Sequence, residues 1–176
     1  MHTIKANRIW LPVLIFLLTS GWSNIHAAEP VVKTPAPVIY LESNLKEPGL
    51  LGWCIDTVGR GLSDRLHAHS CKPKGGDVQF RYDADLQNVV SVAYPQLCMT
   101  IDKSKEFWLL TCDSDNQAQK ISYDPSNLSF SPNQYPQLCV AVHPESRKAG
   151  PFLSRDLLLT KCAETTDELQ RWIIRE

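Results

Sequence analysis

The chain has 176 residues, of which 43% are hydrophobic, and its 18 basic residues nearly balance 19 acidic ones, for a formal net charge of −1. Nucleic acids and anionic membranes attract proteins through clustered Lys and Arg, so this balance argues against nucleic acid and anionic membranes as partners. The length fits one folded domain rather than several.

Residues 1–27 have the composition of a secretory signal peptide. Lys5 and Arg8 give a basic start without an acidic residue, and residues 9–18 form an apolar run of ten. A polar stretch that ends in small residues follows, which predicts cleavage near Ala27. A helix needs about 20 apolar residues to span a bilayer, so a retained anchor is the disfavoured alternative. We therefore expect a secreted or periplasmic protein with no transmembrane anchor after processing.

Residues 28–39 are expected to form a short linker. Three of the 12 prolines fall between positions 29 and 38, together with only two charged residues. Such a composition is typical of an extended tether. The folded domain is therefore predicted to span residues 40–176. Without the signal peptide the chain would carry 16 basic and 19 acidic residues, a formal charge near −3.

The six cysteines form three pairs, and each pair closes a short loop in its own copy of a repeat of roughly forty residues. The pairs are Cys54/Cys71, Cys98/Cys112 and Cys139/Cys162, with spacings of 17, 14 and 23 residues. Export to an oxidising compartment favours disulfide bonds. Structural zinc is the alternative, but the spacings lack the close Cys-x-x-Cys pairs of such sites. We predict one disulfide bond within each copy, because the repeat places the pairs equivalently.

Identical segments in different copies support the repeat. Tyr94-Pro95-Gln96-Leu97-Cys98 recurs 41 residues later, and Tyr82-Asp83 recurs at the same offset as Tyr123-Asp124. The repeats are predicted at about 50–93, 94–134 and 135–176.

The pattern within the copies is that of strands. Short alternating or apolar segments are separated by turns rich in Gly, Pro, Asn and Asp, and residues 167–174 are the weak candidate for a helix. Many short strands in three equal repeats predict an all-β domain, and specifically a closed threefold barrel.

From about residue 50 to its end, the chain resembles a ricin B-type (R-type) lectin domain. The matching features are Cys54-Ile55-Asp56, the second cysteine of each pair, and Gln170-Arg171-Trp172. Gln119-Lys120-Ile121 and Val78-Gln79-Phe80 are weaker copies of the last segment. The resemblance implies a β-trefoil of three disulfide-containing repeats. We expect Phe80, Ile121 and Trp172 to fill its shared core, as buried strand residues usually do.

The resemblance also implies where a sugar would bind. In R-type lectins the contacts come from the aspartate after the first cysteine, an aromatic residue two positions before the second cysteine, and a polar residue before the Gln-x-Trp segment. In the first copy these positions hold Asp56, His69 and Asp77. The second copy has Thr100, Leu110 and Ala118, and the third has Ala141, Thr160 and Leu169. A carboxylate can accept from two sugar hydroxyls at once. At most one sugar site is therefore expected, in the first copy.

Several of these residues have alternative roles. Val78 replaces the glutamine that supports the aspartate in the family, and Gln79 is its candidate substitute. Asp56 could instead organise a turn at residues 59–61. His67 and His69 share a strand face and could bind a metal with Asp56, but without a third certain ligand no metal is expected. Trp53 is a sugar platform or a core residue, and we expect the core.

The function expected first is binding of a glycan or glycoconjugate. The sequence has no Gly-x-Ser-x-Gly, His-Glu-x-x-His or phosphate-loop motif, so we expect no enzymatic activity and no cofactor. Because fold does not fix function, the main alternative is a non-catalytic protein-interaction or toxin-accessory subunit that uses the trefoil as a scaffold. A trefoil protease inhibitor is the weaker alternative.

Overall fold

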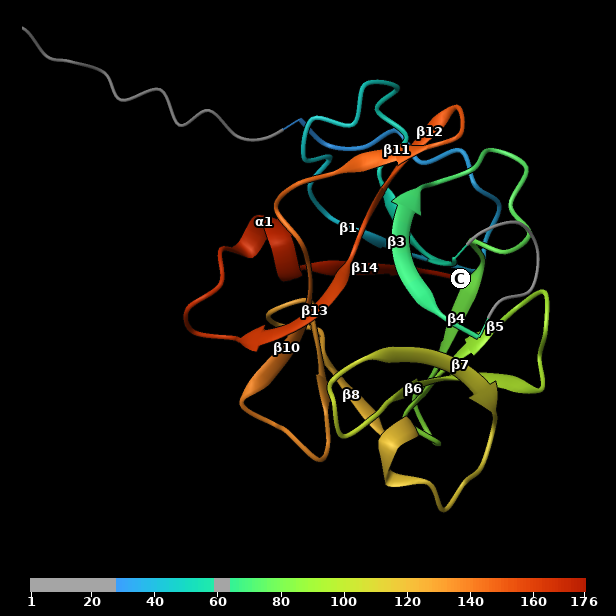
Figure 1. Cartoon of the computed structure of the whole chain (residues 1–176), viewed down its shortest axis with the longest axis vertical. Coiled ribbons are helices and arrows are strands. Elements are labelled where there is room, and N and C mark those ends of the chain that lie inside the picture. The colour runs from blue at the N-terminus through green and yellow to red at the C-terminus, as the bar shows by residue number, and fades with distance from the viewer. Residues whose placement is uncertain (1–27, 59–63) are drawn as a thin grey trace, which may run out of the picture.

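A computed structural model describes residues 28–58 and 64–176, and the predicted signal peptide lies outside them. Within these residues the chain is almost entirely β-structure (Figure 1). The strands are β1 (Val38–Leu41), β2 (Trp53–Thr57), β3 (Leu66–Ser70), β4 (Phe80–Asp83), β5 (Asn88–Ser91), β6 (Leu97–Ile101), β7 (Phe107–Thr111), β8 (Ile121–Asp124), β9 (Ser129–Pro132), β10 (Leu138–Val142), β11 (Arg147–Ala149), β12 (Phe152–Arg155), β13 (Leu157–Lys161) and β14 (Trp172–Arg175). A 3₁₀ turn, η1 (Gln117–Gln119), and a short helix, α1 (Asp167–Gln170), are also present. The helix is shorter than the candidate segment in the sequence because β14 begins at Trp172.

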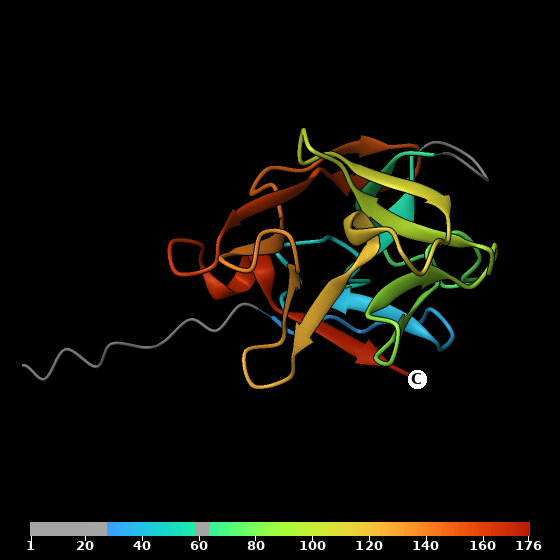
Figure 2. The same ribbon diagram turned by 90° about the horizontal axis from the view of Figure 1, so that it is seen from below.

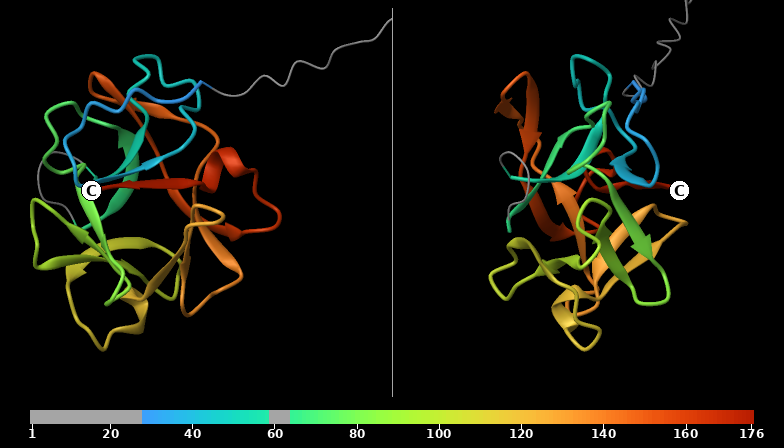
Figure 3. Two further views of the ribbon diagram at one scale, coloured as in Figure 1. Left: turned by 180° about the vertical axis from the view of Figure 1, so that it is seen from behind. Right: turned by 90° about the vertical axis from the view of Figure 1, so that its right-hand side faces the viewer.

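Apart from β11 and β12, the strands fall into three equivalent sets of four around a pseudo-threefold axis (Figure 3, left). In each set the two middle strands form an antiparallel hairpin: β2 with β3, β6 with β7, and β10 with β13. The outer strands pair between sets: β4 with β5, β8 with β9, and β14 with β1. The last pairing joins the first and last strands of the domain, which lie side by side in Figure 2. The predicted all-β, threefold architecture is confirmed.

Side chains from all three sets fill the centre of the molecule. Phe80, Ile121 and Trp172 are fully buried there, as the sequence predicted. Trp53 is also fully buried, and its indole N–H donates to the carbonyl oxygen of Asn44 at 2.7 Å. Trp53 is therefore a core residue and not an exposed sugar platform.

The three predicted disulfide bonds, Cys54–Cys71, Cys98–Cys112 and Cys139–Cys162, are all present. Each joins the first strand of a hairpin to the residue that follows its second strand. The three bonds therefore occupy equivalent places, one in each repeat.

The expected linker lies against the domain over part of its length. β1 begins at Val38, and its first two residues are fully buried. Upstream of β1, the guanidinium group of Arg175 donates to the carbonyl oxygens of Val32 and Thr34. A proline-rich composition does not reveal such contacts, because they use backbone carbonyls that every residue has. The domain thus begins before residue 40 in the structure.

The third repeat contains an additional hairpin, formed by β11 and β12. β12 pairs with β3 of the first repeat and places Ser154 opposite His69. One sheet consequently runs in the order β11-β12-β3-β2-β1-β14. This insertion accounts for the long spacing of the third cysteine pair, and it places third-repeat residues beside the predicted sugar site.

Candidate ligand-binding site in the first repeat

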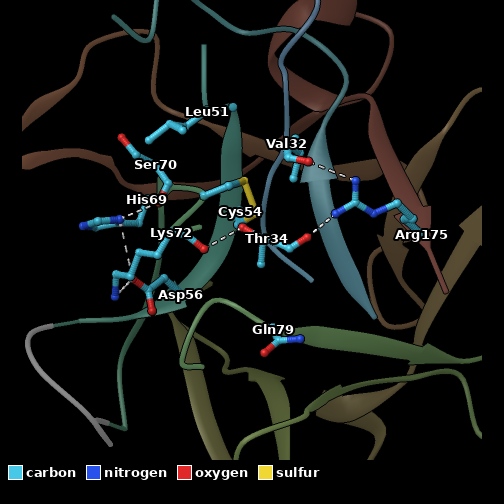
Figure 4. The surroundings of a disulfide bond; sticks show 12 residues. Val32, Thr34, Leu51, Cys54, Asp56, His69, Ser70, Lys72, Gln79 and Arg175 are labelled. Atoms are coloured by element: carbon cyan, nitrogen blue, oxygen red, sulfur yellow. Dashed lines mark hydrogen bonds and ion pairs between the residues drawn. A yellow bond between two sulfur atoms is a disulfide. The ribbon is translucent and has the colours of Figure 1, made fainter. Parts of the chain in front are cut away.

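Asp56 lies in β2, two residues after Cys54, and its side chain is fully buried (Figure 4). Its Oδ1 accepts a hydrogen bond from the backbone N–H of Thr57 at 2.7 Å. Its Oδ2 lies 2.8 Å from the Nζ of Lys72. Oδ1 is therefore hydrogen-bonded within the protein, and Oδ2 is held in an ion pair with Lys72. The turn at residues 59–61 lies outside the described residues.

Lys72 bridges two of the predicted site residues. Its Nζ lies 2.8 Å from Oδ2 of Asp56 and 2.8 Å from Oδ1 of Asp77. Burial alone would lower the pKa of Lys72, but its bonds to the two carboxylates outweigh burial and raise it. Burial alone would raise the pKa of Asp56, but the neighbouring His67 and Lys72 outweigh burial and lower it. The amine stays charged, and Asp56 is its buried counter-ion.

Lys72, rather than Gln79, supports Asp56. Val78, at the position of the family's glutamine, is apolar and fully buried. The side-chain amide of Gln79 donates to the carbonyl oxygen of Pro35 at 3.0 Å, so it holds the N-terminal segment instead. The candidate substitution by Gln79 is therefore wrong.

His67 and His69 lie on one face of β3, with ring centroids 5.6 Å apart. The Nδ1–H of His69 donates to the carbonyl oxygen of Ser70 at 2.8 Å, which leaves Nε2 as an acceptor. Burial lowers the pKa of His69, so its imidazole is neutral at neutral pH. The Nε2 of His67 is 3.8 Å from Oδ2 of Asp56, and neither of its ring nitrogens has a hydrogen-bond partner among the described residues.

A pocket of about 470 Å³ lies beside the two histidines. One wall comes from β3 and Lys72, and the other comes from the hairpin of β11 and β12. Its lining residues are Val58, His67, His69, Lys72, Arg147, Ala149, Gly150, Pro151, Phe152 and Ser154. The ring of Phe152 meets that of His69 edge-on, with centroids 5.5 Å apart. Of the three predicted site residues, His69 lines the pocket, whereas Asp56 and Asp77 hold Lys72 in its wall.

Sequence reasoning missed Lys72, Arg147 and Phe152 as members of this site. The spacing of 23 residues in the third cysteine pair, against 17 and 14 in the others, was a signal for the insertion that carries Arg147 and Phe152. Lys72 had no comparable signal, because its partners lie 5 and 16 positions away and meet it only in the folded chain.

The second and third repeats lack this arrangement. In the second, the side-chain amide of Gln119 donates to Oγ1 of Thr100, the residue equivalent to Asp56, at 2.9 Å. Leu110, equivalent to His69, is apolar and 42% exposed. In the third, the residue equivalent to Asp56 is the fully buried Ala141. Thr100 is tied into the framework by its bond to Gln119, and Leu110 and Ala141 have apolar side chains.

Metal and membrane sites were also considered in the sequence. In residues 28–58 and 64–176, no three His, Cys, Asp or Glu side chains are grouped as metal ligands would be. Within the same ranges, no helix combines the length and the apolar character needed to cross a bilayer.

Comparison with solved structures decides the fold. The cytolethal distending toxin of Actinobacillus actinomycetemcomitans is similar with a TM-score of 0.58 and 16% identity, over 80% of this chain and 91% of that chain. The β-trefoil lectin of the Vibrio vulnificus hemolysin/cytolysin, with N-acetyl-D-lactosamine bound, is similar with a TM-score of 0.54 and 16% identity, over 78% of this chain and 90% of that chain. The fold is a β-trefoil.

A third β-trefoil neighbour is part of a much longer protein. GalNAc-T7, solved with UDP, GalNAc and Mn²⁺, is similar with a TM-score of 0.51 and 16% identity. The match covers 70% of this chain but 20% of that chain. No protein-family model and no curated protein matches the sequence. The β-trefoil implied by the R-type resemblance is confirmed, and at these identities the likeness concerns the fold alone.

Proposed function

We propose that this β-trefoil is a non-catalytic carbohydrate-binding module with one site, the pocket of the first repeat. The observation that carries the proposal is the composition of that pocket. Phe152 and Pro151 offer an apolar surface, and Lys72 and His69 offer polar atoms beside it. A sugar has an apolar C–H face and a rim of hydroxyls, so its recognition needs both kinds of surface. The Vibrio lectin, which binds a disaccharide on the same fold, supports the proposal.

The roles proposed for the site residues differ from those in the R-type pattern. Asp56 and Asp77 position Lys72, since each carboxylate lies 2.8 Å from its amine. Lys72 and His69 then contact the sugar hydroxyls, and Phe152 packs against the ring. The carboxylates of the first repeat are positioning residues in this site.

A glycan array tests the proposal, using the oxidised protein and two variants. Phe152→Ala removes the apolar wall of the pocket. It is expected to abolish binding to every glycan on the array to which the unmodified protein binds. Leu110→Ala is the control, because Leu110 is an exposed apolar residue of the second repeat that lies outside the pocket lining. Failure of the unmodified protein to bind any glycan, or unchanged binding by Phe152→Ala, would contradict the proposal.

A protein-interaction or toxin-accessory subunit is the second candidate function. The buried and ion-paired carboxylate of Asp56 favours it, because none of the described residues that line the first-repeat pocket is acidic. The likeness of the fold to the cytolethal distending toxin also supports it. A catalytic chain encoded beside this protein should then bind it equally before and after Phe152→Ala, as measured by analytical ultracentrifugation.

We also propose that the protein is exported and that its signal peptide is cleaved near Ala27. Three disulfide bonds are typical of extracellular and periplasmic proteins. Ala28 is already bound to the domain, since its carbonyl oxygen accepts from the backbone N–H of Asn44 at 3.2 Å. Intact-mass measurement of the exported protein should give a chain that begins at or next to Ala28, and a retained 1–27 segment would contradict this.

A further inference from the structure

We infer that the ligand of the first-repeat pocket is an acidic sugar, one that carries a carboxylate or a sulfate group. The inference rests on the carbohydrate-binding function proposed above and narrows its ligand class. Among the described residues that line the pocket, the charged ones, Lys72 and Arg147, are both basic. They lie on opposite walls, Lys72 after β3 and Arg147 on β11.

Lys72 has one N–H left for a ligand. An ammonium group carries three N–H donors, and the Asp56 and Asp77 carboxylates lie close enough to take two of them. The side chain of Lys72 is 21% exposed, whereas that of Asp56 is fully buried. A ligand therefore meets the amine before it can meet that carboxylate, and an anionic oxygen is the strongest acceptor for such a donor.

Arg147 provides the second positive charge. Its guanidinium group pairs with Asp156 at 2.7 Å, and both side chains are at least half exposed. Exposed ion pairs contribute little free energy, so Arg147 can exchange Asp156 for a ligand anion at small cost. Guanidinium groups match the planar or forked oxygens of carboxylates and sulfates well.

The histidines set the charge balance of the pocket. With Asp56 and Asp77 beside it, Lys72 is more than neutralised, so the excess positive charge must come from Arg147 once it leaves Asp156, and from protonated His69. His67 lines the pocket, its side chain is more than nine-tenths buried, and both of its ring nitrogens lack a partner among the described residues. His69 faces the same pocket, packed against Phe152. Proton uptake by His69 as the pH falls compensates a ligand anion, which couples binding to acidic pH.

The test compares three versions of one glycan core, N-acetyl-D-lactosamine and its sulfated and sialylated forms, on an array that also carries other neutral and acidic cores. Acidic forms of a core should bind more tightly than the neutral form, and more tightly at pH 5.5 than at pH 7.5. Arg147→Gln should weaken the binding of acidic forms about tenfold, because a hydrogen bond to a charged group is lost. Lys148→Gln is the matched control, since it removes one positive charge from the same strand outside the pocket lining.

The outcomes separate this inference from the function on which it rests. Preference for sulfated or sialylated forms, lost in Arg147→Gln and kept in Lys148→Gln, supports the inference, and the two acidic arms distinguish sulfate from carboxylate. Equal binding of neutral and acidic forms, or equal effects of the two variants, overturns the acidic ligand while the carbohydrate-binding function stands. Binding to no glycan overturns the proposed function itself.

Discussion

Between Asp56 and Asp77 the first repeat holds the ammonium group of Lys72, 2.8 Å from each carboxylate. The position that presents a carboxylate to a sugar in R-type lectins is therefore a buried counter-ion in this protein. At the pocket wall the exposed charged group of this pair is the ammonium of Lys72 rather than a carboxylate. The acidic ligand inferred above rests on this contact together with Arg147 on the opposite wall.

The same contact makes Lys72 important for stability. Lys72→Met would leave Asp56 buried without its cation, and removing one partner of a buried ion pair is costly. We expect the free energy of unfolding to fall by about 3 kcal/mol, measured by urea denaturation with the disulfides intact. Lys74→Met, an exposed lysine two residues away, is the control and should change it little. The double variant Lys72→Met, Asp56→Asn should recover most of the loss, and no recovery would show that the ion pair is not its cause.

A pH dependence follows from His69. Burial lowers its pKa below the ordinary 6.5, so the unfolded chain takes up this proton at a higher pH than the folded chain does. The stability contributed by neutral His69 is thus present above about pH 6.5 and is lost as the pH falls through the folded-state pKa. We expect His69→Phe to reduce the loss of unfolding free energy between pH 7 and pH 5. His143→Gln is the control, and an identical slope in both variants would contradict the prediction.

At the scale of the elements, the repeated dipeptide Tyr82-Asp83 and Tyr123-Asp124 has a structural role in joining repeats. The hydroxyl of Tyr82 donates to the carbonyl oxygen of Ile121 at 3.0 Å, and that of Tyr123 donates to the carbonyl oxygen of Trp172 at 2.9 Å. Each tyrosine thus reaches the core residue of the following repeat. The aspartate that follows each tyrosine accepts a hydrogen bond from a backbone N–H in the turn after its strand.

Elements that repeat were therefore predictable, and elements that occur once were not. The cysteine spacing and the Tyr-Asp pairs recur because each copy packs in the same way on the shared core. They therefore predicted the threefold fold. The hairpin of β11 and β12 has no counterpart in the other copies. The candidate site shows the same division. The resemblance pointed to Asp56, His69 and Asp77, which the structure places around Lys72, whereas Lys72 and the inserted hairpin from the third repeat had no equivalent in the other copies.

The N-terminal segment gives a prediction at this scale. Gly52 has a φ of +78°, and a Cβ there would lie 2.7 Å from the Cβ of Pro30. Gly52→Ala should therefore add a steric clash to the strain of the left-handed backbone, lowering the free energy of unfolding by about 3 kcal/mol. Gly76→Ala, with a φ of +85° and no atom within 4 Å, is the matched control. It carries only the backbone strain, about 1 kcal/mol. Equal losses of unfolding free energy in Gly52→Ala and Gly76→Ala would mean that Pro30 does not pack on Gly52.

At the scale of the whole molecule, the three repeats share one core but not one function. Each disulfide bond lies within a single repeat. The described residues that line the pocket come from the first and third repeats. Stability should therefore depend on all three repeats, whereas ligand binding should not depend on the disulfide of the second.

Removing disulfide bonds one at a time separates these two properties. The Cys98–Cys112 and Cys54–Cys71 bonds close loops of similar length, 14 and 17 residues, so replacing either pair by Ala should lower the free energy of unfolding by about 3 kcal/mol. Without Cys98 and Cys112, the protein should keep its glycan affinity at temperatures where it remains folded. Loss of Cys54 and Cys71 should weaken that affinity as well, because this bond joins β2, which carries Asp56, to the residue next to Lys72. Calorimetric titration with the best glycan of the array measures both, and an equal loss of affinity in the two variants would contradict the independence of the second repeat from the site.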